Sequence, residues 1–484
     1  MEISSNIEFF NWASIKMEAT LAVCAILTLL ATACLPKSFN KIISVFAFVG
    51  MYVALGINFV FPIENGHLGI LPQNNVLGCL IVMCAILSAQ MSFYFFDKLG
   101  RTEYRNEFIA LIMISAASLI IFGRSSNLML AFVALECATI CLYILACFNK
   151  DSSASLEAST KYLIVGGVSG ATLLLGIAFI YGASRISGID FLYFDNFSEG
   201  LLNKFFLVGF ILILAGIFFK IAVFPFQFWA PDVYQGSPTP VSAFFAVASK
   251  IAGVVFLARI CIWFKFDSVE LLGAKEHILT AISAVAIITI LIGNLGGITQ
   301  QKTKRLMAFS GISNAGYLLV LIASLLAQPK ILDSFGPVMF FYLGAYMFAN
   351  YALFFAINQF ADADDSLQSL QDYRGLMRKR PTVASGMIVS LASLAGIPPT
   401  AGFFGKVLIL ILAWWAQLYW LIAVMILGSA ISIYYYFGWI RAMLEKSEGS
   451  EASFEPTPSS VQTIVLLSIA VIVLSVVVLP ILGV

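Results

Sequence analysis

Four ionisable residues lie inside apolar stretches of the sequence, where a charged group is costly. Glu136 stands in FVALECATICLYI, and Lys220, Lys250 and Lys406 stand in three further apolar runs. Three charged lysines at helix centres cost roughly 8–10 kcal/mol in total unless they are paired, hydrated or neutral. Ionisable residues at such depth mark ion pathways and proton relays. We therefore predict a proton relay formed by Glu136, Lys220, Lys250 and Lys406.

Glu136 and Lys220 are the expected ion pair of this relay. Glu136 lies about 12 Å and Lys250 about 16 Å into their runs, near the middle of a hydrocarbon core about 30 Å thick. Burial lowers the pKa of a lysine and a nearby carboxylate raises it, so a lysine held between the two effects exchanges its proton when the carboxylate moves. The alternative is a static ion pair that fixes helix packing. Arg259, followed by Lys265, is expected to reach the membrane surface.

Prolines interrupt two of the apolar runs beside these lysines. Pro225 follows Lys220 by five residues, and Pro398 and Pro399 precede Lys406 in LAGIPPTAGFFGK. A single proline in a membrane helix is usually a tolerated kink. Breaks at matching positions of two repeats, however, point to an ion path near the midplane of the membrane.

The composition requires an integral membrane protein. Of 484 residues, 61% are hydrophobic and 11% charged, whereas soluble chains carry about 25% charged residues. The apolar runs are close to 20 residues long, which predicts helices and not a barrel of alternating ten-residue strands. We expect about fourteen transmembrane helices in an all-α polytopic fold, starting near Met17, Ile42, Val76, Phe108, Leu128, Thr160, Phe205, Thr239, Ile278, Leu306, Phe335, Pro381, Gln417 and Val461.

The predicted helices form two similar sets. Helices 4–8 and helices 9–13 start at offsets between 170 and 178 residues, and the two proline interruptions are offset by 173. Because five is odd, the second set enters from the opposite face, so the repeat is inverted. We predict three N-terminal helices over 1–107, five-helix repeats over 108–265 and 277–445, and a C-terminal helix over 446–484, with helices 7 and 12 discontinuous.

The placement of basic residues predicts the orientation. Four of the 27 Lys and Arg residues lie within predicted spans, sixteen lie in connections after odd-numbered helices, and seven lie on the other side. The positive-inside rule therefore puts the odd connections in the cytoplasm and both termini outside. Glu2 and Glu8 precede the first run, which is expected to be a span and not a cleaved signal. The acidic connection Ala361–Pro381 is expected to be a solvated cytoplasmic loop.

Cysteine and histidine usage predicts no redox cofactor or metal in this chain. The eight cysteines include no CxxC pair, and they fall mostly within apolar runs as small buried side chains. The two histidines, His67 and His277, fall in a loop and at a helix start. The net charge of +1 gives no reason to expect nucleic acid as a partner.

Two long stretches carry a family resemblance. FKIAVFPFQFWAPDVYQGSPTPVSAFFAVASKIA, Phe219–Ala252, and LASLAGIPPTAGFFGKVLIL, Leu391–Leu410, resemble the antiporter-like subunits of respiratory complex I, the NADH-quinone oxidoreductase. PDVYQGSPTP at Pro231–Pro240 is similar to the subunit N type, whose mitochondrial counterpart is called subunit 2 and which also has a plastid counterpart. The likeness extends over helices 4 to 13. The sequence ends soon after the last apolar run, so the long lateral helix of the largest sibling is not expected.

The resemblance implies a proton channel with its relay groups on Glu136, Lys220, Lys250 and Lys406. Position 227 is Gln where members of the family often have His, so water and hydroxyl side chains are expected to join the two halves. Polar residues of helix 10, Ser310, Ser313, Asn314 and Tyr317, are candidates for that role, and packing between helices explains them equally well.

The resemblance also implies a setting for the chain. NADH, FMN, iron–sulfur clusters and quinone are expected in partner subunits, so the chain is enzymatic only as part of a translocase. The expected neighbours are the antiporter-like subunit M and the small subunits K, J and A, in the inner (plasma) membrane of a bacterium with both termini periplasmic. An Mrp-type cation/proton antiporter subunit and a purely structural membrane spacer are the alternatives.

Overall fold

The computed structural model describes residues 15–60, 74–184, 201–263, 272–360, 365, 368–445 and 457–477. Within these residues the chain is all-helical. Glu2, Glu8, His67 and Lys265, most of the start of the acidic connection, and the end of the chain lie outside them.

Seventeen α-helices make up the described part of the chain. They are α1 (Lys16–Cys34), α2 (Asn40–Val60), α3 (Asn74–Leu99), α4 (Arg105–Arg124), α5 (Leu128–Ala146), α6 (Ser153–Ser184), α7 (Leu201–Ile221), α8 (Trp229–Gly236), α9 (Thr239–Trp263), α10 (Leu272–Ile298), α11 (Thr303–Ala327), α12 (Leu332–Phe360), α13 (Leu376–Lys379), α14 (Pro381–Ala395), α15 (Ala401–Trp415), α16 (Tyr419–Leu444) and α17 (Pro458–Val477).

Thirteen of the described helices are long and apolar enough to cross a membrane. The shorter apolar helices α14 and α15 follow one another and together take the place of the predicted helix 12. Helices satisfy their own backbone hydrogen bonds, which is why apolar runs of this length adopt them in lipid. The prediction of an all-α polytopic membrane fold is confirmed.

Both predicted discontinuities are present in the chain. α7 stops at Ile221 and α8 starts at Trp229, so Pro225 lies between two helices. α14 stops at Ala395, and Gly396 follows with a φ of 83°, the left-handed conformation that commonly ends a helix. Pro398 and Pro399 then fill the gap before α15, where they cannot continue a helix.

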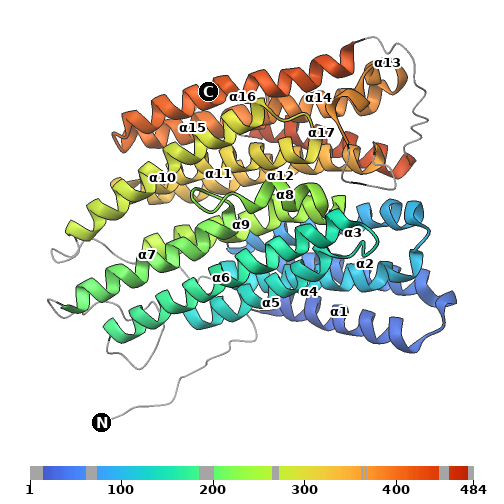
Figure 1. Ribbon diagram of the computed structural model, residues 1–484, viewed down its shortest axis with the longest axis horizontal. Helices are drawn as coiled ribbons and strands as arrows, with labels where there is room; N and C mark the ends of the chain where they lie inside the picture. Colours follow the sequence, from blue (N-terminus) through green and yellow to red (C-terminus); the bar gives the residue numbers. More distant parts are fainter. Residues whose placement is uncertain are drawn as a thin grey trace.

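The helices of the two predicted repeats pack in corresponding pairs. α4 contacts α5 and α9, and its counterpart α10 contacts α11 and α16. Figure 1 shows the chain progressing across the molecule, with the early helices on one side, α16 and α17 on the other, and α8 and α9 between them. α9 contacts α3, α4 and α7 as well as α11 and α12, and its apolar window is buried throughout. It therefore forms the junction of the two halves.

Two glycines allow α6 and α7 to approach closely. A Cβ atom added at Gly176 of α6 would lie 2.7 Å from the carbonyl oxygen of Gly209 on α7 and 2.8 Å from the amide nitrogen of Ile213. Small residues at such contacts are typical of membrane helix pairs, because they let the backbones pack directly.

Replacing Gly176 by Leu is expected to push α6 from α7 and to lower the free energy of unfolding by about 1–3 kcal/mol. Gly167→Leu on the same helix is the control, because a Cβ at Gly167 meets nothing within 4 Å. Thermal unfolding of the two variants in detergent makes the comparison, and equal midpoints would contradict the close approach.

Candidate functional site: a line of buried lysines

Lys220 is buried at the last turn of α7, one residue before the helix stops. Its side chain is 2% exposed, and its Nζ atom donates to Thr139 Oγ1 at 2.8 Å and to Tyr162 Oη at 3.2 Å. The C-terminal end of a helix carries partial negative charge, which favours a cation in the last turn. The hydroxyl groups of α5 and α6, together with the end of α7, therefore give the Lys220 amine a partly polar environment within the apolar core.

Glu136 lies on α5 one turn before Thr139 and is half-buried. Its carboxylate packs against Gly170 of α6, where a Cβ atom would collide with Oε1. Among the described residues it forms no ion pair with Lys220, whose amine donates to Thr139 and Tyr162 instead. The expected pair of Glu136 and Lys220 is therefore not a direct contact in this structure.

A layer of aromatic side chains separates Lys220 from Lys250. The Tyr162 ring lies 4.9 Å from the Trp229 ring and 5.0 Å from the Phe245 ring, measured between centroids. Tyr234 stacks on Phe245 at 6.4 Å and lies 6.0 Å from the Lys250 amine. Trp229 also donates from Nε1 to the carbonyl of Phe219, which accepts from the backbone amide of Ala222 as well. The hydroxyl groups of Tyr162 and Tyr234 are the polar atoms of this layer.

Gln227 lies in the gap between α7 and α8, at the position where the family often has His. Its side chain is 3% exposed, and its Oε1 atom has no hydrogen-bond partner among the described residues. A buried amide oxygen without a partner is costly, so this position suits an ordered water molecule.

Lys250 lies in the middle of α9 and has the least polar surroundings of the three lysines. It is 2% exposed, and its Nζ atom has no hydrogen-bond partner among the described residues. The amine is 5.9 Å from the centroid of the Tyr346 ring, close enough for a cation–π contact. Gly311 of α11 makes room for it, because a Cβ atom there would collide with Nζ.

Lys406 is held by the break in helix 12. Its Nζ atom donates to the carbonyl oxygens of Leu394 at 2.9 Å and Ala395 at 3.1 Å, the last residues of α14. It also lies 5.0 Å from the centroid of the Tyr317 ring. Gly396 passes directly beneath this side chain, since a Cβ atom there would lie 3.0 Å from Lys406 Cδ. The break thus supplies the oxygen atoms that solvate the amine.

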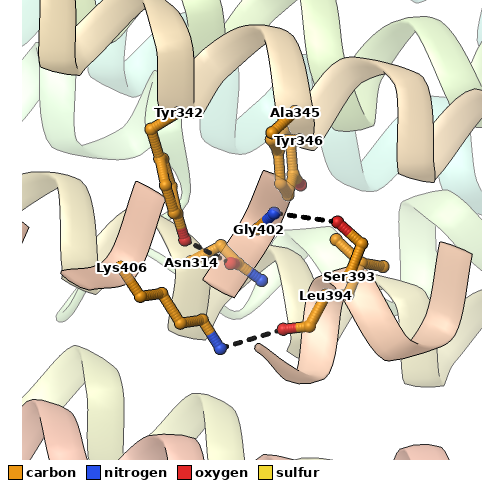
Figure 2. Close-up of a pocket in the computed structure, with 8 residues that line it drawn as sticks. All are labelled: Asn314, Tyr342, Ala345, Tyr346, Ser393, Leu394, Gly402 and Lys406. Atoms are coloured by element: carbon orange, nitrogen blue, oxygen red, sulfur yellow. Dashed lines mark hydrogen bonds between the residues drawn. The ribbon is translucent and has the colours of Figure 1, made fainter. Parts of the chain in front are cut away.

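A small cavity of about 10 Å³ lies beside Lys406, and its volume is close to the space needed for one water molecule. Tyr346, next to Lys250, lines it together with Lys406 (Figure 2). Tyr342 donates to Asn314 Oδ1 at 2.6 Å across the same cavity, as Figure 2 shows. The complete lining is Asn314, Tyr342, Ala345, Tyr346, Ser393, Leu394, Gly402 and Lys406.

The structure brings two of the four polar candidates of helix 10 to this cavity region. Asn314 lines it, and Tyr317 lies over the Lys406 amine. Ser310 instead bonds Tyr436, and Ser313 bonds the carbonyl of Ser310 on its own helix. These two serines contribute to packing.

Several residues of the site have no distinctive sequence signal. Thr139 and Tyr162 are single polar residues in apolar runs, so their contact with Lys220 depends on how α5, α6 and α7 pack. Tyr342 and Tyr346 are four residues apart and therefore share one helix face. The four-residue spacing of these tyrosines in the sequence is the signal from which a polar helix face near the lysines could have been predicted.

The expectation for Arg259 is wrong. The side chain is 2% exposed, donates to the carbonyl of Gly123 at 3.0 Å, and lies 4.6 Å from the Trp263 ring. The guanidinium is bonded to α4 and buried in the protein, so it is not exposed to water as a surface anchor would be. Nearby, Arg124 pairs with buried Glu18 at 2.5 Å, a contact between α4 and α1 that the sequence pattern did not predict.

The described residues include no group of three or more His, Cys, Asp and Glu side chains placed to hold a metal ion. The polar groups of the site are amines, hydroxyls, amides and one carboxylate. This set suits the binding and transfer of protons.

Similar proteins share both the sequence and the fold. A protein of Opitutus terrae named NADH-quinone oxidoreductase subunit N 1 is 37% identical over 89% of this chain and 87% of its own length. A chain of respiratory complex I from Thermus thermophilus, solved with bound aureothin, superposes with a TM-score of 0.78 and 28% identity, covering 96% of this chain and 98% of that one. A chain of the Mrp complex from Dietzia has a TM-score of 0.77 at 19% identity, with 96% of this chain and 95% of that one covered, which is a likeness of fold alone.

Broken helices, buried lysines and corresponding helix pairs define an antiporter-like membrane subunit. Residues 125–432 match the model of the family described as NADH:quinone oxidoreductase/Mrp antiporter, TM. The chain belongs to this family and, within it, to the NADH-quinone oxidoreductase subunit N proteins.

The different surroundings of Lys250 and Lys406 predict different responses to Met, which keeps the length of the side chain without the amine. Lys250→Met is expected to leave the free energy of unfolding unchanged or to raise it, because no described hydrogen bond is lost. Lys406→Met should lower it by about 1–3 kcal/mol, because two carbonyl oxygens lose their partner. Thermal unfolding in detergent measures both, and equal destabilisation would contradict this geometry.

Proposed function

We propose that this chain is the proton-translocating membrane-arm subunit of an NADH-quinone oxidoreductase. It moves protons along Glu136, Lys220, Lys250 and Lys406, driven by electron transfer in other subunits. The observation that carries the proposal is the cavity lined by both Lys406 and Tyr346, whose ring centroid lies 5.9 Å from the Lys250 amine. Three buried amines, one of them beside a water-sized space that extends toward the next, suit stepwise proton transfer.

The first step of the proposed relay takes place at Lys220. A carboxylate at Glu136 stabilises the ammonium form of Lys220 through the low-dielectric interior. Glu136 is half-buried, so it has room to move away from Lys220. Once the carboxylate moves, the ammonium loses that stabilisation and releases its proton toward the hydroxyl groups of Thr139 and Tyr162.

The later steps pass through Lys250 to the second half. The proton reaches Lys250 past the aromatic layer, and a water molecule in the cavity carries it between Tyr346 and Lys406. Lys406 holds it against the carbonyl oxygens of Leu394 and Ala395 before it leaves toward the outer face. The breaks at Pro225, Pro398 and Pro399 give these groups freedom to rearrange.

The proposal assigns the redox chemistry to partner subunits. NADH, FMN, iron–sulfur clusters and quinone bind elsewhere in the complex, so the chain acts in the enzyme as its translocating part. The proposed neighbours are the antiporter-like subunit M and the small subunits K, J and A. Within the chain, we assign residues 1–107 to a flanking unit, 108–265 and 277–445 to the inverted repeats, and 446–484 to a C-terminal helix.

Sequence identity favours this function over an Mrp-type antiporter. The subunit N protein of Opitutus terrae is 37% identical to the chain, whereas the Mrp chain of Dietzia is 19% identical. An antiporter subunit predicts cation exchange in membranes that lack any dehydrogenase partner. A structural spacer predicts that loss of a buried lysine leaves pumping intact.

Lys406→Ala in the assembled complex is expected to lower the number of protons moved per electron while electron transfer continues, because the last proton site of the second half is lost. Simultaneous measurement of quinone reduction and proton uptake in vesicles gives this ratio. Lys330→Ala is the matched control, since Lys330 is exposed in the short turn before α12. A normal ratio in both Lys220→Ala and Lys406→Ala would exclude the relay.

The proposed location is the plasma membrane of a bacterium, with both termini on the periplasmic side. In a variant without native cysteines, Lys379→Cys is expected to react with a membrane-impermeant maleimide only from the cytoplasm, and Glu276→Cys only from the periplasm. Both positions are exposed and lie at opposite ends of the predicted spans. Labelling of the two from the same side would contradict the orientation.

A further inference from the structure

The short helix α8 links the break in helix 7 to both halves of the protein. It follows the break directly and packs against α6, α9 and α11. Trp229 and Tyr234, two rings of the aromatic layer between Lys220 and Lys250, both belong to it. The position of this eight-residue helix therefore sets whether the layer is closed.

One carboxylate on α8 forms ion pairs with both halves. Asp232 accepts from Lys161 of α6 at 2.8 Å through Oδ2 and from Arg305 of α11 at 2.8 Å through Oδ1. The three side chains are between 33% and 43% exposed, so water has access to these pairs. Partly exposed ion pairs are modest in strength and can exchange with water.

The far end of α8 rests tightly on α6. A Cβ atom at Gly236 would lie 2.7 Å from Ala158 Cβ and would collide with the carbonyl of Ala154. Gly236 thus anchors one end of the helix, while Asp232 holds the middle. Trp229, at the other end, borders the break, where the backbone forms isolated turns in place of a continuous helix.

The aromatic layer is closed when α8 is in this position. The Trp229 ring lies 4.9 Å from Tyr162, the residue that bonds the Lys220 amine, and Tyr234 lies 6.0 Å from the Lys250 amine. Because Asp232 and these two rings share one short helix, release of the carboxylate allows the rings to move together.

We propose that Asp232 is a positioning residue that keeps the aromatic layer closed between Lys220 and Lys250, and that protons pass when α8 separates from Lys161 and Arg305. This inference rests on the proposed relay. It adds a control point in the middle of α8, away from the lysines themselves.

Asp232→Asn in the assembled complex tests the inference, because it keeps the shape and removes the charge. In vesicles without NADH, the passive proton conductance is expected to rise about fivefold, since two partly exposed ion pairs are lost. The number of protons moved per electron should fall, while quinone reduction continues. Added salt should raise the conductance of the wild type by screening the pairs and leave that of Asp232→Asn unchanged.

Two matched variants separate this role from a general loss of charge. Glu157→Gln removes the other partner of Lys161, an exposed ion pair at 2.7 Å, and is expected to leave the vesicles proton-tight. Asp232→Glu keeps the charge and is expected to restore tightness. Arg305→Gln removes the ion pair between Asp232 and α11 and leaves the one with α6. It should give a smaller rise in passive proton conductance, and it serves as the test if Asp232→Asn fails to assemble.

The inference would be overturned if vesicles with Asp232→Asn stay proton-tight and keep a normal proton-to-electron ratio. If Asp232→Asn does not assemble, the same result for Arg305→Gln would overturn it. Failure of the proposed relay would give a different result. A normal proton-to-electron ratio in both Lys406→Ala and Lys220→Ala would contradict the proposed function, whatever the result for Asp232→Asn.

Discussion

An ammonium group inside a membrane protein must be solvated by oxygen atoms, and here the end of a broken helix provides them for one lysine and hydroxyl groups of unbroken helices provide them for another. Lys406 bonds the carbonyl oxygens of Leu394 and Ala395, which are free because α14 stops at that point. Lys220 lies in the last turn of α7 and bonds two hydroxyl groups. Lys250 is in the continuous helix α9 and bonds no described residue. Its charged form therefore depends on water, and its surroundings are less polar than those of Lys220 and Lys406.

The rest of the fold serves to keep this line apart from lipid. α9 is surrounded by helices of both halves, so the Lys250 amine meets only protein. Glycines at 311 and 396 leave space for the lysine side chains where any larger residue would fill it. Aromatic rings close the space between Lys220 and Lys250 without offering a continuous row of hydrogen-bonding groups. The rings therefore separate the surroundings of Lys220 from those of Lys250.

The sequence predicted those features that are local along the chain. Apolar runs, Pro225 and the Pro398–Pro399 pair identify the spans and breaks, because hydropathy and proline act within one helix. The partners of the lysines come from other helices, so Thr139 and Tyr162 were not predicted, and neither was the gap between Glu136 and Lys220. Arg259 was misjudged for the same reason, since its burial depends on α4 and not on its distance from the end of α9.

The two breaks also depart from the symmetry of the repeat. Lys220 precedes its break and Lys406 follows its break, whereas an exact repeat would put both lysines before the interruption or both after it. The Lys406 amine reaches back to the carbonyl oxygens of Leu394 and Ala395, which precede the break, while the Lys220 amine bonds hydroxyl groups of α5 and α6. One break therefore solvates its lysine directly and the other does not, so the two halves surround their amines differently although their helices correspond.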